Sequence, residues 1–158
     1  MKSNIENKNI FINKVFNQVF DKYDLMNDIM SFGTHRLWKK QLMNWLAPSI
    51  NKKLIDVASG TGDIVKLYTK YTNNKCQINA IDPNPKMIEV GKKKLGQNKN
   101  IIWHIGTAEE LKFKDKTFDY YTIVFGIRNI SNINLVLKEA YRVLKPGGRF
   151  MCLEFSKI

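Results

Sequence analysis

The chain has 158 residues, a length typical of one domain built around a single hydrophobic core. Hydrophobic residues make up 44% of it and charged residues 25%, a composition that excludes disordered and fibrous proteins. Lys and Arg outnumber Asp and Glu by 26 to 14, which gives a net charge of +12. Such a charge indicates either a binding surface for nucleic acid or an anionic membrane, or a compositional bias. The lysines are spread over every segment, and this favours a compositional bias.

Helices are predicted for the first part of the chain. Apolar residues recur at helical spacing over 9–30, which predicts one or two amphipathic helices there. A further helix is predicted over 35–46, and Pro48 follows it as a stop signal. We therefore expect residues 1–47 to form a helical N-terminal cap.

From residue 48 the pattern changes to strands that alternate with helices. This alternation predicts parallel strands joined by right-handed crossovers, and so an α/β fold: an open, mostly parallel, Rossmann-like sheet with helices on both faces. We expect one domain over 1–158, with its α/β core at 48–158. Ligands of such sheets bind at the carboxyl ends of the strands, near the topological switch point. The predicted strands are 53–58, 77–81, 101–105, 120–125 and 149–155, and the predicted helices 64–71, 86–95 and 134–144.

A glycine turn follows the first predicted strand, in the sequence DVASGTGD (56–63). Gly60 and Gly62 allow the backbone to turn tightly and to approach a ligand closely. Val65 stands where the dinucleotide fingerprint has its third glycine, and the Gly-Lys-Ser/Thr ending of a P-loop is absent. Taken alone, the turn fits a ligand site and a plain strand-to-helix connection equally well.

Asp82 ends the second predicted strand, about twenty residues after the glycine turn, where an acidic side chain accepts hydrogen bonds from a ribose diol. Alternatively, this Asp before Pro83 caps the next helix. The glycine turn and the spaced Asp, without a third glycine, favour a nucleoside such as S-adenosylmethionine over a dinucleotide. After the third strand, Thr107-Ala108-Glu109 is placed either to cover an adenine ring or to cap a turn.

The segment FDYYTIVFGIRNI (118–130) carries the fourth predicted strand. Arg128 and Asn129 follow Gly126 at the end of this strand, an unusual pair for a structural turn, and we interpret them as functional. Leu144-Lys145-Pro146-Gly147-Gly148 is interpreted as a helix stop and a turn before the last strand.

Several classes of protein are excluded by what the sequence lacks. No apolar run approaches the roughly 18–20 residues of a membrane-spanning helix. The first residues, MKSNIENKNIF, lack the apolar stretch of a secretory signal. Cys76 and Cys152 are too few for a disulfide framework, and neither they nor His35 and His104 have the spacing of a metal site. We expect a cytoplasmic protein with no metal and no nucleic-acid partner.

The chain resembles the UbiE-type C-methyltransferases of ubiquinone and menaquinone biosynthesis, from about Val15 to Lys157. The glycine turn and LKPGG are shared by methyltransferases in general, whereas the block at 22–40 and FGIRN are particular to this family. The segments that carry the resemblance are KYDLMNDIMSFGTHRLWKK (22–40), DVASGTGD (56–63), DKTFD to FGIRN (115–129) and YRVLKPGGRFMCLEFSK (141–157).

The resemblance implies the class I fold, a seven-stranded S-adenosylmethionine-dependent methyltransferase sheet. Family members continue beyond the LEFSK segment, so we expect the last strands of that sheet to be absent here and the fifth strand to be an unpaired edge. The chain departs from the family pattern at Ser59, usually Gly, at Thr107, often Asn, and at Val124, often Ser. The implied cofactor-binding residues are Ser59, Gly60, Thr61, Gly62, Asp82, Thr107 and Ala108.

The resemblance also implies the reaction, which is C-methylation of a prenylated benzoquinol or naphthoquinol ring. By placement and resemblance, Arg128 stabilises the phenolate of the acceptor, Asn129 hydrogen-bonds a ring oxygen, and Tyr23 or Asp24 closes over the ring. The prenyl tail of such an acceptor lies in a bilayer. We therefore expect contact with an anionic membrane surface, at the inner membrane, and either a homodimer or membership of a quinone-synthesis complex.

Other functions remain open at this point. A methyltransferase for another small aromatic acceptor would share the glycine turn, but the FGIRN segment argues against this function. A non-catalytic subunit of a quinone-synthesis assembly would keep the fold and lose the reaction. An RNA-binding methyltransferase-like protein is suggested by the charge of +12 and predicts clustered Lys and Arg with interleaved aromatic residues.

Overall fold

The computed structural model describes residues 34–155. The chain divides into two compact units between Trp38 and Lys39, and the whole sheet belongs to the unit that begins at Lys39. The predicted helices over 9–30, with Tyr23 and Asp24, lie outside the described residues. A single domain with a cap over 1–47 stays a prediction.

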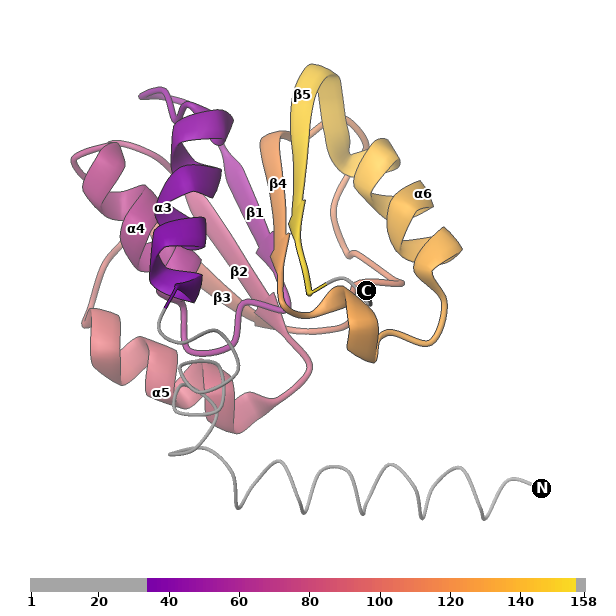
Figure 1. Cartoon of the computed structure of the whole chain (residues 1–158), viewed down its shortest axis with the longest axis horizontal. Coiled ribbons are helices and arrows are strands. Elements are labelled where there is room, and N and C mark those ends of the chain that lie inside the picture. Colours follow the sequence, from indigo (N-terminus) through magenta and orange to yellow (C-terminus); the bar gives the residue numbers. More distant parts are fainter. Residues whose placement is uncertain (1–33, 156–158) are drawn as a thin grey trace. The chain divides into compact units, whose positions relative to one another are not determined.

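The described part of the chain forms a five-stranded parallel sheet in the order β3-β2-β1-β4-β5 (Figure 1). The strands are β1 (Leu54–Val57), β2 (Ile78–Asp82), β3 (Ile101–Ile105), β4 (Phe118–Val124) and β5 (Leu144–Leu153). The helices are α3 (His35–Leu46), α4 (Asp63–Tyr71), α5 (Pro85–Leu95) and α6 (Ile133–Val143), with a short 3₁₀ helix η1 (Ile127–Asn129) after β4.

The predicted fold class is confirmed, with most element ends within two residues of those predicted. The largest difference is at β5, which begins at Leu144 rather than at Arg149. Leu144 pairs with Phe118, and pairing resumes between Arg149 and Tyr120 after a register irregularity. The predicted turn at 145–148 is therefore an irregularity within the strand, where Gly147 has φ +76°.

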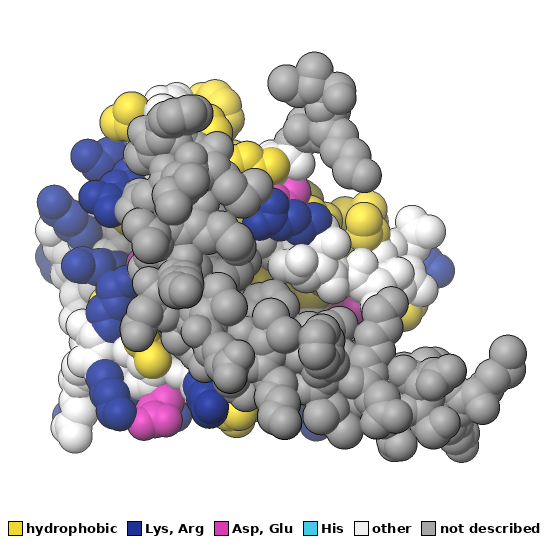
Figure 2. Space-filling model, turned by 60° about the horizontal axis from the view of Figure 1, so that its bottom comes forward, with side chains coloured by type: hydrophobic (Ala, Val, Ile, Leu, Met, Phe, Trp, Pro, Cys, Tyr) yellow, Lys and Arg dark blue, Asp and Glu magenta, His cyan; other side chains and the backbone are white. Residues whose placement is uncertain are grey.

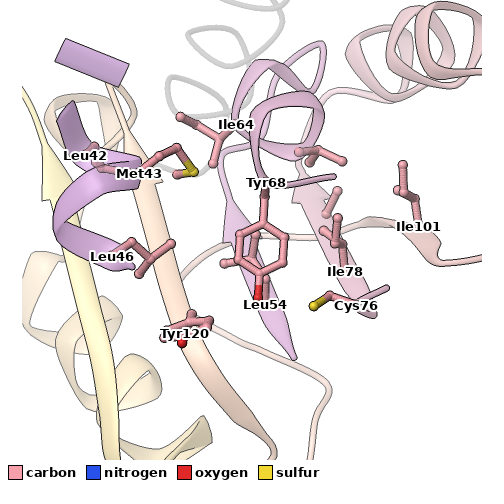
Figure 3. Packing of buried hydrophobic residues seen from close by; sticks show 12 residues of the cluster. Leu42, Met43, Leu46, Leu54, Ile64, Tyr68, Cys76, Ile78, Ile101 and Tyr120 are labelled. Carbon is pink, nitrogen blue, oxygen red and sulfur yellow. The ribbon is translucent and has the colours of Figure 1, made fainter. Parts of the chain in front are cut away.

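One face of the sheet is covered by α3 and α4, whose apolar side chains pack on alternate residues of the strands (Figure 3). Tyr68 of α4 is fully buried and meets Tyr120 of β4 edge to face, with ring centroids 6.1 Å apart. Arg149 and Tyr120 donate side-chain hydrogen bonds to carbonyl groups at the end of α3, at Leu46 and Ala47 respectively. These bonds satisfy helix-end carbonyls and fix α3 on the sheet.

The opposite face is covered by α6 and by the connection from β3 to β4. Ile55 and Val57 of β1 point to this face, whereas Leu54 points to the other, as expected of a strand. Arg142 of α6 holds the connection, because its guanidinium donates to the carbonyl oxygens of Leu111 and Phe113. The β3–β4 connection contains no helix, so this clamp supplies its fixed position.

Asp119 anchors the amino ends of the strands, far along β4 from the carboxyl edge. Its carboxylate accepts a hydrogen bond from the backbone N–H of Lys53 at 2.9 Å and from the ammonium groups of Lys52 and Lys145. Burial opposes this charge, but the hydrogen bonds and lysines outweigh it, so the pKa of Asp119 is lowered. The Phe118-Asp119 part of the FD…GIRN segment is therefore structural.

Candidate functional site

The glycine turn after β1 is held in a conformation that favours ligand approach. Ala58, Gly60 and Gly62 have φ of +52°, +53° and +82°, while Ser59 has no positive φ. Ser in place of the usual Gly at residue 59 is therefore accommodated without backbone strain. A Cβ added at Gly60 would meet no atom within 4 Å, so the space beside the turn is open.

Asp82, at the end of β2, lies directly against this turn. One carboxylate oxygen accepts the backbone N–H of Gly60 at 2.8 Å, and the other accepts that of Asn84 at 2.9 Å. Burial raises the pKa of Asp82, and these two hydrogen bonds partly offset that rise. Asn84, rather than Asp82, caps α5, since its side chain accepts the N–H of Lys86. The helix-cap interpretation of Asp82 is therefore wrong.

Asp56 is the most deeply buried carboxyl group of the site. It is 1% exposed, and one carboxylate oxygen accepts the hydroxyl of Thr122 at 2.6 Å while the other has no hydrogen-bond partner. Burial raises its pKa to about 7, against the opposing effect of the Thr122 hydrogen bond. The hydroxyl of Ser59 is also buried without a partner. Such orphaned groups beside an open turn indicate a place for a polar ligand.

The end of β4 lies against the same turn. A Cβ on Gly126 would come within 2.5 Å of the Cβ of Ala58, so glycine is required for this close approach of β4 to β1. Phe125 has φ +54°, a strained conformation for an aromatic residue, and its ring stacks on that of Phe155 with centroids 4.8 Å apart. Strained backbone at the ends of two neighbouring strands is typical of a functional edge.

Arg128 lies on η1, after Gly126, as the sequence predicted for a residue of this edge. Its guanidinium lies 5.3 Å from the ring centroid of Phe155, and its Nε lies 3.7 Å from Oε1 of Glu154. The backbone N–H of Arg128 also donates to Glu154 Oε2. The carboxylate and the ring therefore orient a cation at the rim, where Arg128 and Asn129 are exposed.

A second cation, Lys39, lies at the same edge and belongs to α3, which covers the same face of the sheet as α4. Its ammonium donates to Oδ2 of Asp63, the first residue of α4, at 2.7 Å, and lies 5.9 Å from the ring centroid of Phe125. Lys94 of α5 pairs with the other oxygen of Asp63. Burial alone would raise the pKa of Asp63, but the two lysines outweigh it and lower the pKa to about 2.

The structure brings most of the predicted cofactor residues to one edge. Thr107 is exposed in the connection after β3, whereas the side chain of Ala108 is buried in the core, which leaves its backbone for a ligand contact. Tyr23 lies outside the described residues. The predicted residues at the ends of the first, second and fourth strands are Ser59, Gly60, Thr61, Gly62, Asp82, Arg128 and Asn129.

Sequence reasoning missed three charged residues of this edge: Lys39, Asp56 and Glu154. A signal existed for Asp56, because an acidic residue inside the apolar run LIDV indicates a buried charge. Lys39 and Glu154 carried no comparable signal, since their partners lie more than twenty residues away in the chain.

The surface of the described residues gives the context of the site. Lys and Arg side chains appear at several separate places on the face shown in Figure 2, interspersed with other residue types. None of the helices in residues 34–155 is long and apolar enough to span a membrane. Within the same range, no group of three or more His, Cys, Asp and Glu side chains is arranged to hold a metal ion.

Comparison with known proteins extends over almost the whole chain. Residues 2–158 match the ubiE/COQ5 methyltransferase family. The curated ubiquinone/menaquinone biosynthesis C-methyltransferase UbiE of Rickettsia bellii is 52% identical over 157 residues, which cover 96% of this chain and 63% of that protein. The chain thus spans about three fifths of the length of such relatives.

Solved structures show the same fold at lower identity. YcgJ of Bacillus subtilis matches with a TM-score of 0.67 and 24% identity, over 73% of this chain and 49% of that one. A SAM-dependent methyltransferase of Aquifex aeolicus matches with a TM-score of 0.61 and 23% identity, over 68% of this chain and 58% of that one. The sheet is therefore that of class I methyltransferases.

Proposed function

The chain belongs to the ubiE/COQ5 methyltransferase family, and from this membership we propose that it binds S-adenosylmethionine and methylates a ring carbon of a prenylated benzoquinol or naphthoquinol. The observation that carries the proposal is the pair of buried, unpartnered oxygens beside the open glycine turn. Asp56 Oδ2 and Ser59 Oγ are two of the three buried side-chain polar atoms without a hydrogen bond among the described residues. The third, the hydroxyl of Tyr121, lies within β4.

The residues at this edge fit the two ends of such a cofactor. Asp82 has further lone pairs beside those that accept Gly60 and Asn84, and these suit the two hydroxyl groups of a ribose. Asp56 and Ser59 offer acceptors to an ammonium group of an amino-acid end. The absence of a Cβ at Gly60 leaves room for the atoms between those two ends.

When bound, S-adenosylmethionine supplies an electrophilic methyl group, so the protein has to provide a carbon nucleophile in line with it. A quinol that loses a phenolic proton carries negative charge on the ring carbons ortho and para to the oxygen. The guanidinium of Arg128 stabilises that phenolate, while a water that it orients takes the proton. Asn129 is adjacent and donates to a ring oxygen.

Replacing Arg128 by Ala is expected to lower the rate of methyl transfer about 100-fold or more, the range seen when a charge-stabilising group is removed. Transfer of a labelled methyl group to a short-chain demethylmenaquinol measures this rate. Lys66→Ala, which removes an exposed cation from α4, is the matched control and should leave the rate unchanged. An unchanged rate in the Arg128 variant would remove Arg128 from the reaction.

The prenylated acceptor also requires a visit to a bilayer, so we propose a cytoplasmic protein that associates with the inner membrane through its excess of cationic residues. Sedimentation with vesicles is expected to show binding to phosphatidylglycerol-containing vesicles and weaker binding to pure phosphatidylcholine. Because surface charges are screened, the difference should shrink at about 0.5 M salt. Equal binding to both vesicle types would contradict the electrostatic contribution. The homodimer and the quinone-synthesis complex stay predictions.

Another small aromatic acceptor is not favoured, since the curated relatives are quinone-biosynthesis enzymes by name. A non-catalytic assembly subunit is likewise disfavoured, because such a subunit has no need of the orphaned oxygens of Asp56 and Ser59.

A further inference from the structure

Lys39 is a buried cation whose ion pair with Asp63 uses only part of its capacity to donate hydrogen bonds. It is 7% exposed, although lysine is rarely buried, and its ammonium lies at the edge of the sheet that carries the proposed site. Asp63 accepts one of its three N–H donors, and the ring of Phe125 lies 5.9 Å away. A buried ammonium with donors to spare at a ligand edge suits an anionic group of the ligand.

The ion pair with Asp63 does not prevent Lys39 from binding a second anion. Asp63 is held by Lys94 as well, at 2.5 Å, so its charge stays compensated when Lys39 shares its donors with a ligand. The attraction of Lys39 also extends to Asp56, whose pKa it lowers against the larger effect of burial. Lys39 is therefore close enough to Asp56 for their charges to interact.

The order of the strands determines which end of the ligand faces Lys39. Asp82 ends β2, the glycine turn follows β1, and Phe125 follows β4, and these three strands are neighbours in this order. A nucleoside held through its ribose by Asp82 lies on the β2 side. The part of the ligand attached to its 5′ position then crosses the turn toward β4, where Lys39 lies over Phe125.

We propose that Lys39 binds the α-carboxylate at the amino-acid end of the cofactor and so selects amino-acid-bearing adenosyl ligands over their decarboxylated counterparts. This inference rests on the proposed function, because it presupposes an adenosyl ligand. In this proposal α3, which lies outside the glycine turn, recognises the α-carboxylate of the ligand.

Two ligands that differ only by the carboxylate test the proposal in calorimetric titrations of the full chain. One is S-adenosylhomocysteine, and the other is 5′-deoxy-5′-(3-aminopropylthio)adenosine, which keeps the ammonium and lacks the carboxylate. We expect the wild-type chain to bind the first about 10- to 100-fold more tightly, the range of a charged hydrogen bond. In Lys39→Met the two affinities should become equal, through loss of affinity for S-adenosylhomocysteine alone.

Lys66→Met is the matched control, because it removes an exposed lysine of α4 and should keep the wild-type preference. Lys39→Arg retains the charge and should restore part of the preference. Circular dichroism of each variant establishes that it is folded. If Lys39→Met does not fold, the wild-type ratio and that of Lys39→Arg decide the question.

The outcomes separate this proposal from the proposed function. Equal affinities in the wild-type chain, or equal weakening of both ligands in Lys39→Met, would overturn the role of Lys39 and leave adenosyl binding intact. A folded wild-type chain that binds neither ligand would overturn the cofactor assignment, and the role of Lys39 with it. A preference that disappears in Lys39→Met and persists in Lys66→Met would support the proposal.

Discussion

Replacing Asp82 by Ala is expected to weaken the binding of S-adenosylhomocysteine roughly 100-fold or more, because two hydrogen bonds from a ribose to a charged acceptor are lost together. The effect should exceed that of any other single replacement at the glycine turn. Asp82 also accepts the backbone N–H groups of Gly60 and Asn84, so its loss loosens the turn that faces the ligand. Calorimetric titration of the wild-type chain and the variant measures the change.

The controls for this experiment separate binding from folding. Asp82→Asn keeps the size of the side chain and one acceptor, and is expected to fold like the wild-type chain by circular dichroism. Glu89→Gln removes an exposed carboxylate on α5 that pairs with Lys93, and should leave the affinity unchanged. A folded Asp82 variant with wild-type affinity would contradict the placement of the ribose at the end of β2.

Replacing Asp56 by Asn is expected to make the protein more stable near pH 8, at the expense of cofactor affinity. The pKa of Asp56 is about 7 in the folded chain, well above the value of about 3.9 for an unfolded Asp. The folded state therefore binds a proton more tightly than the unfolded state. Stability from this group is fully present below pH 4 and is lost as the pH rises toward 7.

Asn resembles the protonated carboxyl and does not titrate, so it avoids this loss. The free energy of unfolding of Asp56→Asn, minus that of the wild-type chain, should increase between pH 4 and pH 8 by on the order of 2–4 kcal/mol. Urea denaturation at a series of pH values measures this difference. Asp63 does not interfere, because its lowered pKa affects stability only as the pH falls below about 4. If the difference in unfolding free energy between Asp56→Asn and the wild-type chain did not depend on pH, ionisation of Asp56 would not destabilise the folded state.

The strands could be predicted from sequence because each is a short apolar run next to turn residues. Leu54–Val57 and Ile78–Asp82 are buried along their whole length. Short apolar runs that alternate with amphipathic helices are typical of the buried strands of a parallel sheet. The start of β5 was not predictable in the same way. Pro146 and Gly147 indicate a turn, and only pairing of Leu144 with β4 places that turn inside the strand.

The residues of the candidate site that directly follow strands could be predicted from the sequence. The side-chain pairs that depend on contacts between distant elements could not. The glycines and Asp82 follow strands directly, so the topology alone brings them together. The ion pair of Arg128 with Glu154 requires β4 and β5 to be neighbours in register, and that of Lys39 with Asp63 requires the packing of α3 beside α4. No local pattern encodes either pair.

The order of the strands also has a consequence for how the chain folds. The strands β1, β2 and β3 are consecutive in sequence, as are β4 and β5, and the two groups meet only where β1 pairs with β4. The partners along that seam, such as Leu54 and Tyr120, are separated by more than sixty residues, so closing it costs more chain entropy than any other pairing in the sheet.

Hydrogen bonds that involve side chains also cross this seam, among them those from Thr122 to Asp56 and from the backbone N–H of Lys53 to Asp119. The proposed ligand would lie across it too, held by Asp82 on one side and facing Phe125 on the other. Ligand binding would therefore stabilise the strand pairing that costs the most chain entropy, and so link occupancy of the site to the stability of the whole sheet.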